Sequence, residues 1–332
     1  MQQKSNSAPG KASAAARYAV IIANPASHRF ARGIEELHET VQFLQQHGWQ
    51  AELRLTQAAD DARRFTREAV EQKAAMVVAV GGDGTIHCVI QELAGTETAL
   101  AVLPAGTFNV WAKETGIPLD IAQARDVLLN GKVQRIDLGY VQKYNHYFLL
   151  MAGIGFGGEV TYEVKKDSLK WLGVPGYILT GIRLGLGFES FPVELLIDGR
   201  VERTRALQIV VGNTKLYGSL LQFTWRAKCD DGLLDVCVVR RPGRLHRLVV
   251  MWDFLWQLQR RRKWITYTTC KTVEVRTRRP IAFQVDGEPI GHTPATFTIA
   301  PAALNVIVPQ ESPEGLFSHP PVAEMRTQNA GV

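Results

Sequence analysis

Short apolar runs alternate with amphipathic segments over the first third of the chain. The apolar runs lie at 18–25, 51–56, 75–82 and 99–106, and the segments with a helical period lie at 33–48, 60–73, 85–95 and 121–132. This alternation is typical of β-α-β units that form a parallel sheet covered by helices on both faces. The pattern therefore predicts an α/β domain over residues 17–135.

The pattern changes after Arg135, where strand-like runs are separated by turn signals. These runs lie at 135–142, 146–155, 192–200, 206–213, 233–240, 272–277, 281–290 and 295–300. Their spacing and their β-branched content predict an antiparallel β-sandwich over residues 136–308. A helical hairpin near 169–188 and an amphipathic helix near 246–263 are expected to interrupt it.

The two ends of the chain differ from these domains. Residues 1–16 are polar and rich in Ala and Ser, without the apolar run of a secretory signal, and are expected to be a disordered tail. Residues 309–332 carry several prolines and few large apolar residues, and we expect a C-terminal tail that can pack back on the first domain. The longest uncharged segments hold roughly a dozen residues, against the about 20 that span a bilayer, so no transmembrane helix is expected.

Composition narrows the class of protein only partly. The 332 residues are 46% hydrophobic, which suits two globular domains. The net charge of +6 suits a polyanion, an anionic membrane or a phosphorylated small molecule without choosing among them. Four scattered cysteines lack disulfide or zinc spacing, and this favours a reduced, cytoplasmic setting.

A glycine-rich turn follows the third predicted strand, in the stretch VVAVGGDGTIHCV at 77–89. Its glycines allow the backbone to approach a phosphate closely, and Thr85 begins the next helix. The carboxylate of Asp83 would be repelled by phosphate, so it indicates a bridging Mg²⁺ or a hydroxyl whose proton it accepts. Both uses imply phosphoryl chemistry. The alternative is a plain turn in which Asp83 caps the following helix.

Polar residues also follow the other predicted parallel strands. Thr107 and Asn109 follow the fourth strand, Thr56 ends the second, and the turn at 24–27 follows the first. Because the carboxyl ends of parallel strands meet at one edge of a sheet, we expect these groups to face one ligand.

Two acidic turns occur in the second predicted domain. The stretch KCDDGLLDV at 228–236 carries Asp230, Asp231 and Asp235, and FQVDGEPI at 283–290 carries Asp286 and Glu288. An Asp-Gly pair between strands is commonly no more than a hairpin turn. Converging carboxylates, however, could hold a hydrated Mg²⁺ and supply the general base that phosphoryl transfer to an alcohol requires.

Eight motifs in order carry a resemblance to a known family. They are NPAS at 24–27, GGDGT at 81–85, LPAGTFN at 103–109, IDLG at 136–139, GIGFGGEV at 153–160, VVGN at 210–213 with a Gly at 218, DDGLLDV at 230–236 and VDGEP at 285–289. From Ala19 to Val308 the chain resembles the diacylglycerol kinase catalytic-domain superfamily, which includes bacterial YegS-like lipid kinases and the sphingosine and ceramide kinases. GGDGT is shared with NAD kinases and is similar to the phosphofructokinase loop, whereas DGLLD and VDGE favour lipid kinases.

The resemblance implies a fold and a set of site residues. It implies an α/β N-terminal domain of the NAD kinase and phosphofructokinase type, a C-terminal antiparallel β-sandwich, and an active site in the cleft between them. The residues that it implies contact ATP are Asn24, Pro25, Ser27, Thr56, Gly81, Gly82, Asp83, Gly84, Thr85, Thr107 and Asn109. It implies a structural Mg²⁺ at Asp231 with backbone oxygens of Lys228 and Leu233. With Asp83, the implied catalytic residues are Asp286 and Glu288, either of which can be the proton acceptor.

The chain departs from the family pattern at four positions. His28 stands where the family usually has Gly, His87 and Cys88 stand where it has Asn-Glu, and Val110 stands where it has Asp. Val110 removes a carboxylate next to the expected ATP and Mg²⁺ contacts. We expect His87 to be packed or solvated rather than catalytic.

The predicted function is an ATP- and Mg²⁺-dependent lipid kinase that transfers the γ-phosphoryl group to the hydroxyl of diacylglycerol or a related lipid. The alternatives are a kinase of a soluble substrate, similar to NAD kinases, and a catalytically silent module that binds nucleotide or lipid. No nucleic-acid motif is present, so no nucleic-acid partner is expected, and a homodimer is left open.

A lipid substrate requires contact with a membrane. Residues 240–264 combine Trp252, Trp256 and Trp264 with many Arg and Lys residues, which suits an anionic interface, although a core helix with a solvated basic face has the same pattern. Residues 165–171 form a second candidate surface, with Lys165, Lys166, Lys170 and Trp171. We therefore expect a cytoplasmic protein that associates peripherally with membranes.

Overall fold

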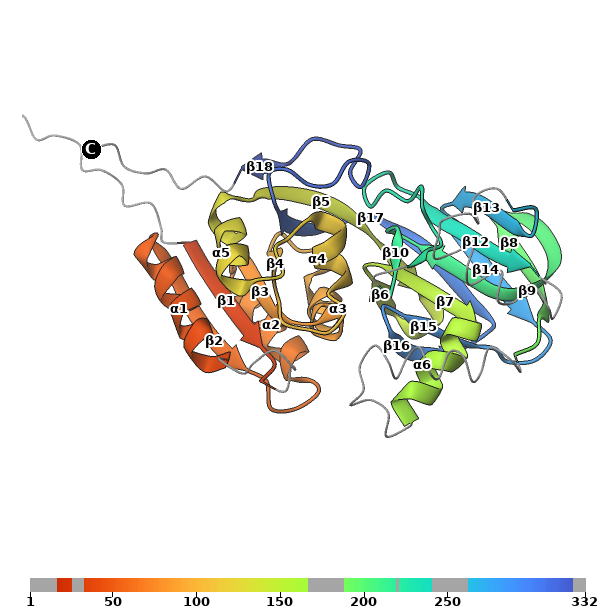
Figure 1. Ribbon diagram of the computed structural model, residues 1–332, viewed down its shortest axis with the longest axis horizontal. Coiled ribbons are helices and arrows are strands. Elements are labelled where there is room, and N and C mark those ends of the chain that lie inside the picture. The colour runs from red at the N-terminus through yellow and green to blue at the C-terminus, as the bar shows by residue number, and fades with distance from the viewer. Residues whose placement is uncertain (1–16, 26–32, 167–187, 219–220, 241–261, 325–332) are drawn as a thin grey trace, which may run out of the picture.

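The computed structural model describes residues 17–25, 33–166, 188–218, 221–240 and 262–324, which form two lobes (Figure 1). The expected helical hairpin near 169–188 and the expected helix near 246–263 lie almost wholly outside these residues. None of the described helices is long and apolar enough to cross a membrane.

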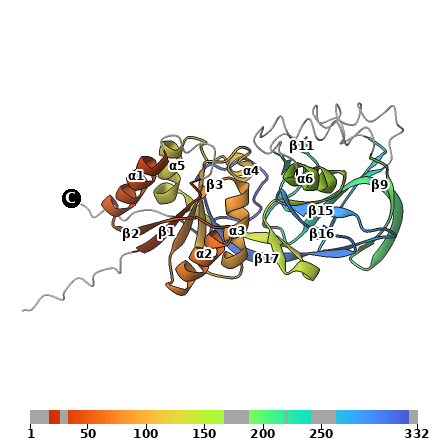
Figure 2. The same ribbon diagram turned by 90° about the horizontal axis from the view of Figure 1, so that it is seen from below.

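The first lobe is a parallel sheet between two layers of helices. Its strands are β1 (Arg17–Ala23), β2 (Trp49–Leu55), β3 (Met76–Gly81) and β4 (Ala99–Pro104), in the order β2-β1-β3-β4. Its main helices are α1 (Gly33–Gln46), α2 (Asp61–Glu71), α3 (Asp83–Leu93) and α5 (Ile121–Asn130). Figure 2 shows α1 and α5 on one face of the sheet and α2 and α3 on the other. Every residue of β3 and β4 is buried, as expected for a sheet covered on both faces, and the predicted α/β domain is confirmed.

The second lobe is the predicted antiparallel sandwich, which is also confirmed. Its strands are β6 (His146–Phe148), β7 (Met151–Gly155), β8 (Phe191–Ile197), β9 (Arg200–Gly212), β10 (Leu216–Tyr217), β11 (Leu221–Gln222), β12 (Leu234–Arg240), β13 (Ile265–Cys270), β14 (Thr272–Thr277), β15 (Ala282–Val285) and β16 (Glu288–His292). Phe191, Phe283 and Phe297 are fully buried in its core. Helix α6 (Phe156–Lys166) packs against β15 and β16 (Figure 2).

Two long strands run from one lobe to the other (Figure 1). Strand β5 (Lys132–Val141) pairs antiparallel with β17 (Ala295–Val308) along most of its length. The first part of β17 pairs with β14 of the sandwich, and Val306 near its end pairs in parallel with Leu100 of β4. The sheet is therefore continuous through both lobes, and the change of pattern near Arg135 falls inside β5.

The segment after β17 returns along the surface of β5. The carboxylate of Asp230 accepts hydrogen bonds from the N–H groups of Ser318 and His319, and Leu316 is buried. Strand β18 (Ala323–Glu324) then pairs with β5. The described part of the C-terminal tail is therefore held by hydrogen bonds of its backbone to the Asp230 side chain and to β5.

One local structure differs from the sequence-based expectation. The run 146–155, expected as one strand, is divided at Leu149 and Leu150 into β6 and β7, because the N–H groups there donate to the side chain of Asp286. The short helix α4 (Val110–Thr115) follows the turn after β4, where the strand-turn-helix pattern of residues 103–118 predicts a helix.

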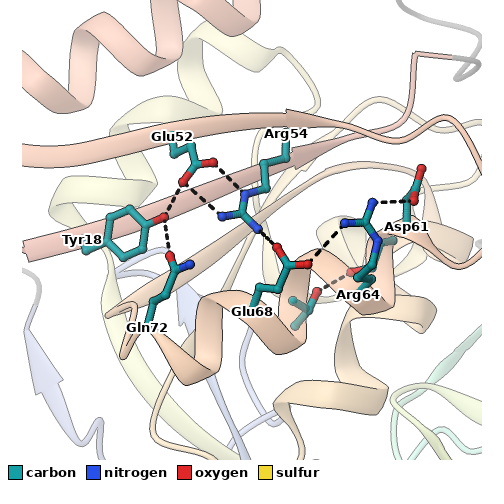
Figure 3. Close-up of polar contacts among 9 residues, drawn as sticks. Tyr18, Glu52, Arg54, Asp61, Arg64, Glu68 and Gln72 are labelled. Carbon is teal, nitrogen blue, oxygen red and sulfur yellow. Dashed lines mark hydrogen bonds and ion pairs between the residues drawn. The ribbon is translucent and has the colours of Figure 1, made fainter.

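An ion-pair network joins the outer strand β2 to α2 (Figure 3). Arg54 donates to Glu52 of the same strand at 2.8 Å and to Glu68 of α2 at 2.5 Å. Tyr18 of β1 donates to Glu52, and Arg64 donates to Glu68 at 3.2 Å. The side chain of Arg54 is 12% exposed, against 54% for Arg64, so Arg54 is the cation whose removal would matter more.

We expect Arg54→Met to lower the free energy of unfolding by about 1–2 kcal/mol, because it leaves Glu52 and Glu68 without their shared cation. Arg64→Met is the matched control and should change it by less than about 0.5 kcal/mol. Urea denaturation measures both. Equal effects of the two substitutions would show that the network does not depend on Arg54.

Candidate active site

The candidate residues of the first lobe lie at one edge of the parallel sheet. Asn24 follows β1, Thr56 follows β2, and the glycine turns at 81–85 and 105–109 follow β3 and β4. The N–H of Thr56 donates to Ala23 O at 2.9 Å, and the N–H of Asn24 donates to Val80 O at 3.3 Å. The structure therefore brings these strand ends together. Pro25 is exposed beside Asn24, and Ser27 lies outside the described residues.

The two glycine turns touch each other. A Cβ built on Gly106 would lie 2.2 Å from Gly82 Cα, a distance that no side chain can occupy. The N–H of Ala105 also donates to Gly81 O at 2.9 Å. Close approach of the two backbones is thus the reason for glycine at these positions. Beside this contact, Gly84 and Thr107 are exposed and Thr85 is half-buried. Gly84 and Thr85 lie at the N-terminal, positive end of α3, where an anion is stabilised.

Asp83 joins the first glycine turn to α4. Its Oδ1 accepts the N–H of Val110 at 2.8 Å and that of Trp111 at 3.4 Å. Burial raises the pKa of Asp83 to about 6, and the negative charge of Asp286 raises it further. Asp83 therefore does more than cap its own helix, because its side chain binds the start of α4, 27 residues later.

Asp286 sits in the turn between β15 and β16. Its carboxylate accepts three backbone N–H groups, from Leu149 at 2.7 Å, Leu150 at 2.9 Å and Met151 at 3.0 Å. Its own N–H donates to Met151 O at 2.9 Å, its φ is 49°, and its side chain is 3% exposed. These contacts bind the hairpin to the break between β6 and β7.

Glu288, two residues later, faces the first lobe. Its Oε1 lies 3.6 Å from the position that a Cβ on Gly84 would take. Glu288 is half-buried and begins β16, whereas Gly84 is exposed at the start of α3. The second acidic turn therefore brings one carboxylate against the backbone of the glycine turn.

Comparison with known proteins shows the family to which the two lobes belong. A family model described as the diacylglycerol kinase catalytic domain matches residues 18–141, and one described as the YegS C-terminal NAD kinase beta sandwich-like domain matches residues 152–308. A Pseudomonas putida protein named "Probable lipid kinase YegS-like" is 36% identical over 86% of this chain and 94% of its own length. This chain belongs to the diacylglycerol kinase family.

Other relatives extend the family across genera. A Bacillus subtilis protein named "Diacylglycerol kinase" is 30% identical over 89% of this chain and 98% of its own length. A solved structure from Bacillus anthracis str. Sterne has a TM-score of 0.74 at 25% identity and covers 92% of this chain and 99% of that one. The expected family, the α/β domain and the β-sandwich are thus confirmed.

Val110 contacts the site through its backbone. The Val110 side chain is buried, and the contact that this residue makes at the site is the backbone N–H bond to Asp83. Any residue except proline supplies that N–H. The preceding Asn109 uses its amide within the turn, where Oδ1 accepts the Gly106 N–H and Nδ2 donates to Gly106 O, both at 2.9 Å. Asn109 therefore shapes the turn, and its contact with nucleotide stays a prediction.

The first acidic turn of the sandwich has its own partners. Asp231 is exposed and accepts the N–H of Leu233 at 3.1 Å, while Asp230 holds the C-terminal segment and Asp235 accepts the hydroxyl of Tyr267 at 2.5 Å. Among the described residues no group of three or more His, Cys, Asp or Glu is placed to hold a metal ion. The Mg²⁺ site implied at Lys228, Asp231 and Leu233 therefore stays a prediction.

Two residues at the site carried no signal in the sequence. Glu114 in α4 is buried and accepts the N–H of Leu216 in the second lobe, and burial raises its pKa. His146 begins β6 and contacts His87 of α3. Neither stands in a recognisable motif, because each acts on a residue that is distant in the sequence.

The raised pKa of Asp83 predicts a pH-dependent gain in stability for Asp83→Asn. Between its ordinary pKa and about 6 the folded state binds the extra proton, so the ionised carboxylate costs stability above about pH 6 and the cost fades as the pH falls. We expect Asp83→Asn, which keeps the acceptor for Val110, to raise Tm by about 2–5 °C at pH 7.5 and by less at pH 5. Calorimetry without ligand measures both.

Asp61→Asn is the matched control of opposite sign. Arg64 and two backbone N–H groups lower the pKa of Asp61 to about 2, so ionisation of Asp61 favours folding at neutral pH. This variant should not gain stability at either pH. A Tm gain for Asp83→Asn of equal size at both pH values would contradict the proposed cost of ionisation.

Proposed function

We propose that this protein is an ATP- and Mg²⁺-dependent lipid kinase that transfers the γ-phosphoryl group to a hydroxyl of diacylglycerol or a related lipid. Family membership supports a kinase that uses ATP. The observation that carries the proposal is the approach of Glu288 to Gly84, because it places a carboxylate of the sandwich lobe beside the glycine turn of the α/β lobe.

The first lobe supplies a site for the phosphates of ATP. The glycine turns present backbone rather than side chains, and α3 begins at this point, so anionic oxygens can approach the N–H groups. The residues fit a divalent cation bound with the nucleotide, since Asp83 is a half-buried acid whose raised pKa a cation would lower, and such sites use one or two carboxylates with phosphate oxygens. When bound, Mg²⁺ would neutralise charge on the transferring group.

Glu288 is the better candidate for the proton acceptor. The carboxylate of Asp286 already accepts three backbone N–H groups and is 3% exposed, so its oxygens are committed to holding the turn. Glu288 is half-buried and faces the glycine turn. We assign Glu288 the role of taking the proton from the lipid hydroxyl, and Asp286 that of fixing the turn in place.

These contacts give less support to the two alternative functions. The missing carboxylate at Val110 would favour a silent module, but the backbone N–H of this residue still binds Asp83. The soluble-substrate alternative rests on GGDG alone, whereas the match to the YegS-type sandwich covers residues 152–308. Incubation with labelled ATP and either lipid extract or NAD separates these alternatives by the labelled product.

We expect Glu288→Gln to lower kcat for lipid phosphorylation by about 10²–10⁴-fold while ATP binding is kept, because the amide cannot accept the proton. Glu194→Gln is the matched control, since Glu194 pairs with Arg203 and Arg276 on the sandwich surface. Labelled-phosphate transfer to diacylglycerol and calorimetric ATP titration are the measurements. Full activity of Glu288→Gln would remove the assignment.

Contact with an anionic membrane is part of the proposal and rests on the sequence of residues 240–264, most of which lie outside the described residues. We expect more protein to sediment with vesicles containing phosphatidylglycerol than with phosphatidylcholine vesicles, and salt to weaken the difference. Equal binding to both kinds of vesicle would argue against a basic membrane surface.

A further inference from the structure

Helix α3 is attached to the sandwich lobe along β6. The Gln91 Nε2 donates to Tyr147 O at 2.9 Å, and the Tyr147 N–H donates to Gln91 Oε1 at 3.0 Å. One side chain of the helix thus satisfies both backbone groups of a strand residue. Because α3 begins with Asp83, this contact ties the glycine turn to the strand that precedes the N–H groups bound by Asp286.

One helical turn nearer to Asp83, a row of three polar side chains crosses between the lobes. His87 Nε2 lies 2.7 Å from His146 Nε2 of β6, and His87 Nδ1 lies 3.5 Å from Asp286 Oδ2. The two imidazole rings have centroids 4.8 Å apart and are tilted by 36°. His87 is 5% exposed, so these contacts form in a site that is largely closed to water.

The chemistry of the three groups sets the direction of the hydrogen bonds. An ionised carboxylate only accepts, so His87 Nδ1 must donate to Asp286. The Nε2 of a neutral His87 then accepts from His146 Nε2, and the row runs from His146 through His87 to Asp286. If His87 is charged, Nε2 donates instead and His146 accepts. In both cases one proton lies between the two rings.

The surrounding charges are compatible with this row. Burial, followed by the nearby His87, lowers the pKa of His146 to about 4, so His146 is neutral at pH 7. Arg63 of α2 acts in the same direction, and Asp286 opposes it. Arg63 itself pairs with Glu92 of α3 at 2.9 Å.

We propose that His87 is a positioning residue. It holds the turn that carries Asp286 and Glu288 at a set distance from Gly84, which lies on the same helix as His87. His87 stands four residues after Asp83, so one rigid helix carries both the phosphate turn and the contact to the acceptor turn. His146 completes the row by orienting the imidazole of His87. The catalytic consequence rests on the proposed function, because it concerns transfer between these two turns.

The variants His87→Asn and His87→Leu distinguish a positioning role of His87 from a role in packing alone. The Asn side chain can place an N–H donor near the position of His87 Nδ1, whereas Leu fills similar space without a donor. We expect His87→Leu to lower kcat by about 10²-fold with the KM for ATP within about twofold, since a small misplacement of reacting groups has such an effect. His87→Asn should recover most of kcat, and His146→Leu should lower kcat less than His87→Leu.

Equal kcat values for wild type and His87→Leu would overturn the proposal, as would equal losses in the Leu and Asn variants. If His87→Leu does not fold, His146→Leu tests the same row from its other end. The proposal would be overturned if His146→Leu changed neither kcat nor the ¹⁵N chemical shifts of His87.

A second measurement does not depend on activity. With ¹⁵N-labelled histidine, the protein has eight imidazoles, and the signals that disappear in the His87 and His146 variants identify this pair. We expect one Nε2 of the pair to show the shift of a hydrogen-bonded acceptor, and that shift to change in the partner when either residue is replaced. If replacing either histidine left the ¹⁵N shifts of the other unchanged, the proposed row would be overturned. Failure of the wild type to phosphorylate any lipid would refute the proposed function, while these signals would still decide whether the row exists.

Discussion

The hydrogen bonds to the carboxylate of Asp286 determine much of the geometry at the junction of the lobes. Three N–H groups from residues 149–151 converge on this carboxylate, and a carboxylate with such donors needs no cation to be stable in a buried place. The donors are available because the strand run is broken there and these N–H groups leave the sheet ladder. The positive φ of Asp286 is kept by the same contacts and turns Glu288 toward the first lobe.

Asp83 presents the opposite arrangement. It accepts N–H groups from the start of α4, but burial dominates and raises its pKa to about 6. A site whose carboxylate is only partly compensated by hydrogen bonds is less stable without its ligand than with it. This is a common property of functional sites, where stability is given up for binding or chemistry. The two aspartates thus differ in what completes their environment: the protein itself for Asp286, and a bound group for Asp83 in the proposed function.

The lobes are joined by backbone and by side chains at different places. Strands β5 and β17 make the sheet continuous between them. Near the site, Glu114 of α4 and the His87 and Gln91 side chains of α3 bind backbone or side chains of the second lobe. Both helices that follow the glycine turns therefore contact the sandwich. The glycine turns and the turn of Asp286 and Glu288 are therefore joined by side-chain contacts as well as by the continuous sheet.

The sequence by itself determined the elements whose pattern is local. Continuous apolar runs at 75–82 and 99–106 predicted buried parallel strands, because a sheet covered on both faces needs no polar alternation. The glycine turns and the acidic turns were likewise recognisable from adjacent residues. What the tertiary structure alone decided are contacts between residues far apart, such as His87 with Asp286, 199 positions later. It also gave Asp286 three backbone N–H donors, set Glu288 beside Gly84 and joined the N–H of Val110 to Asp83. These depend on where the strands and turns meet in space, and no period or motif along the chain records that distance.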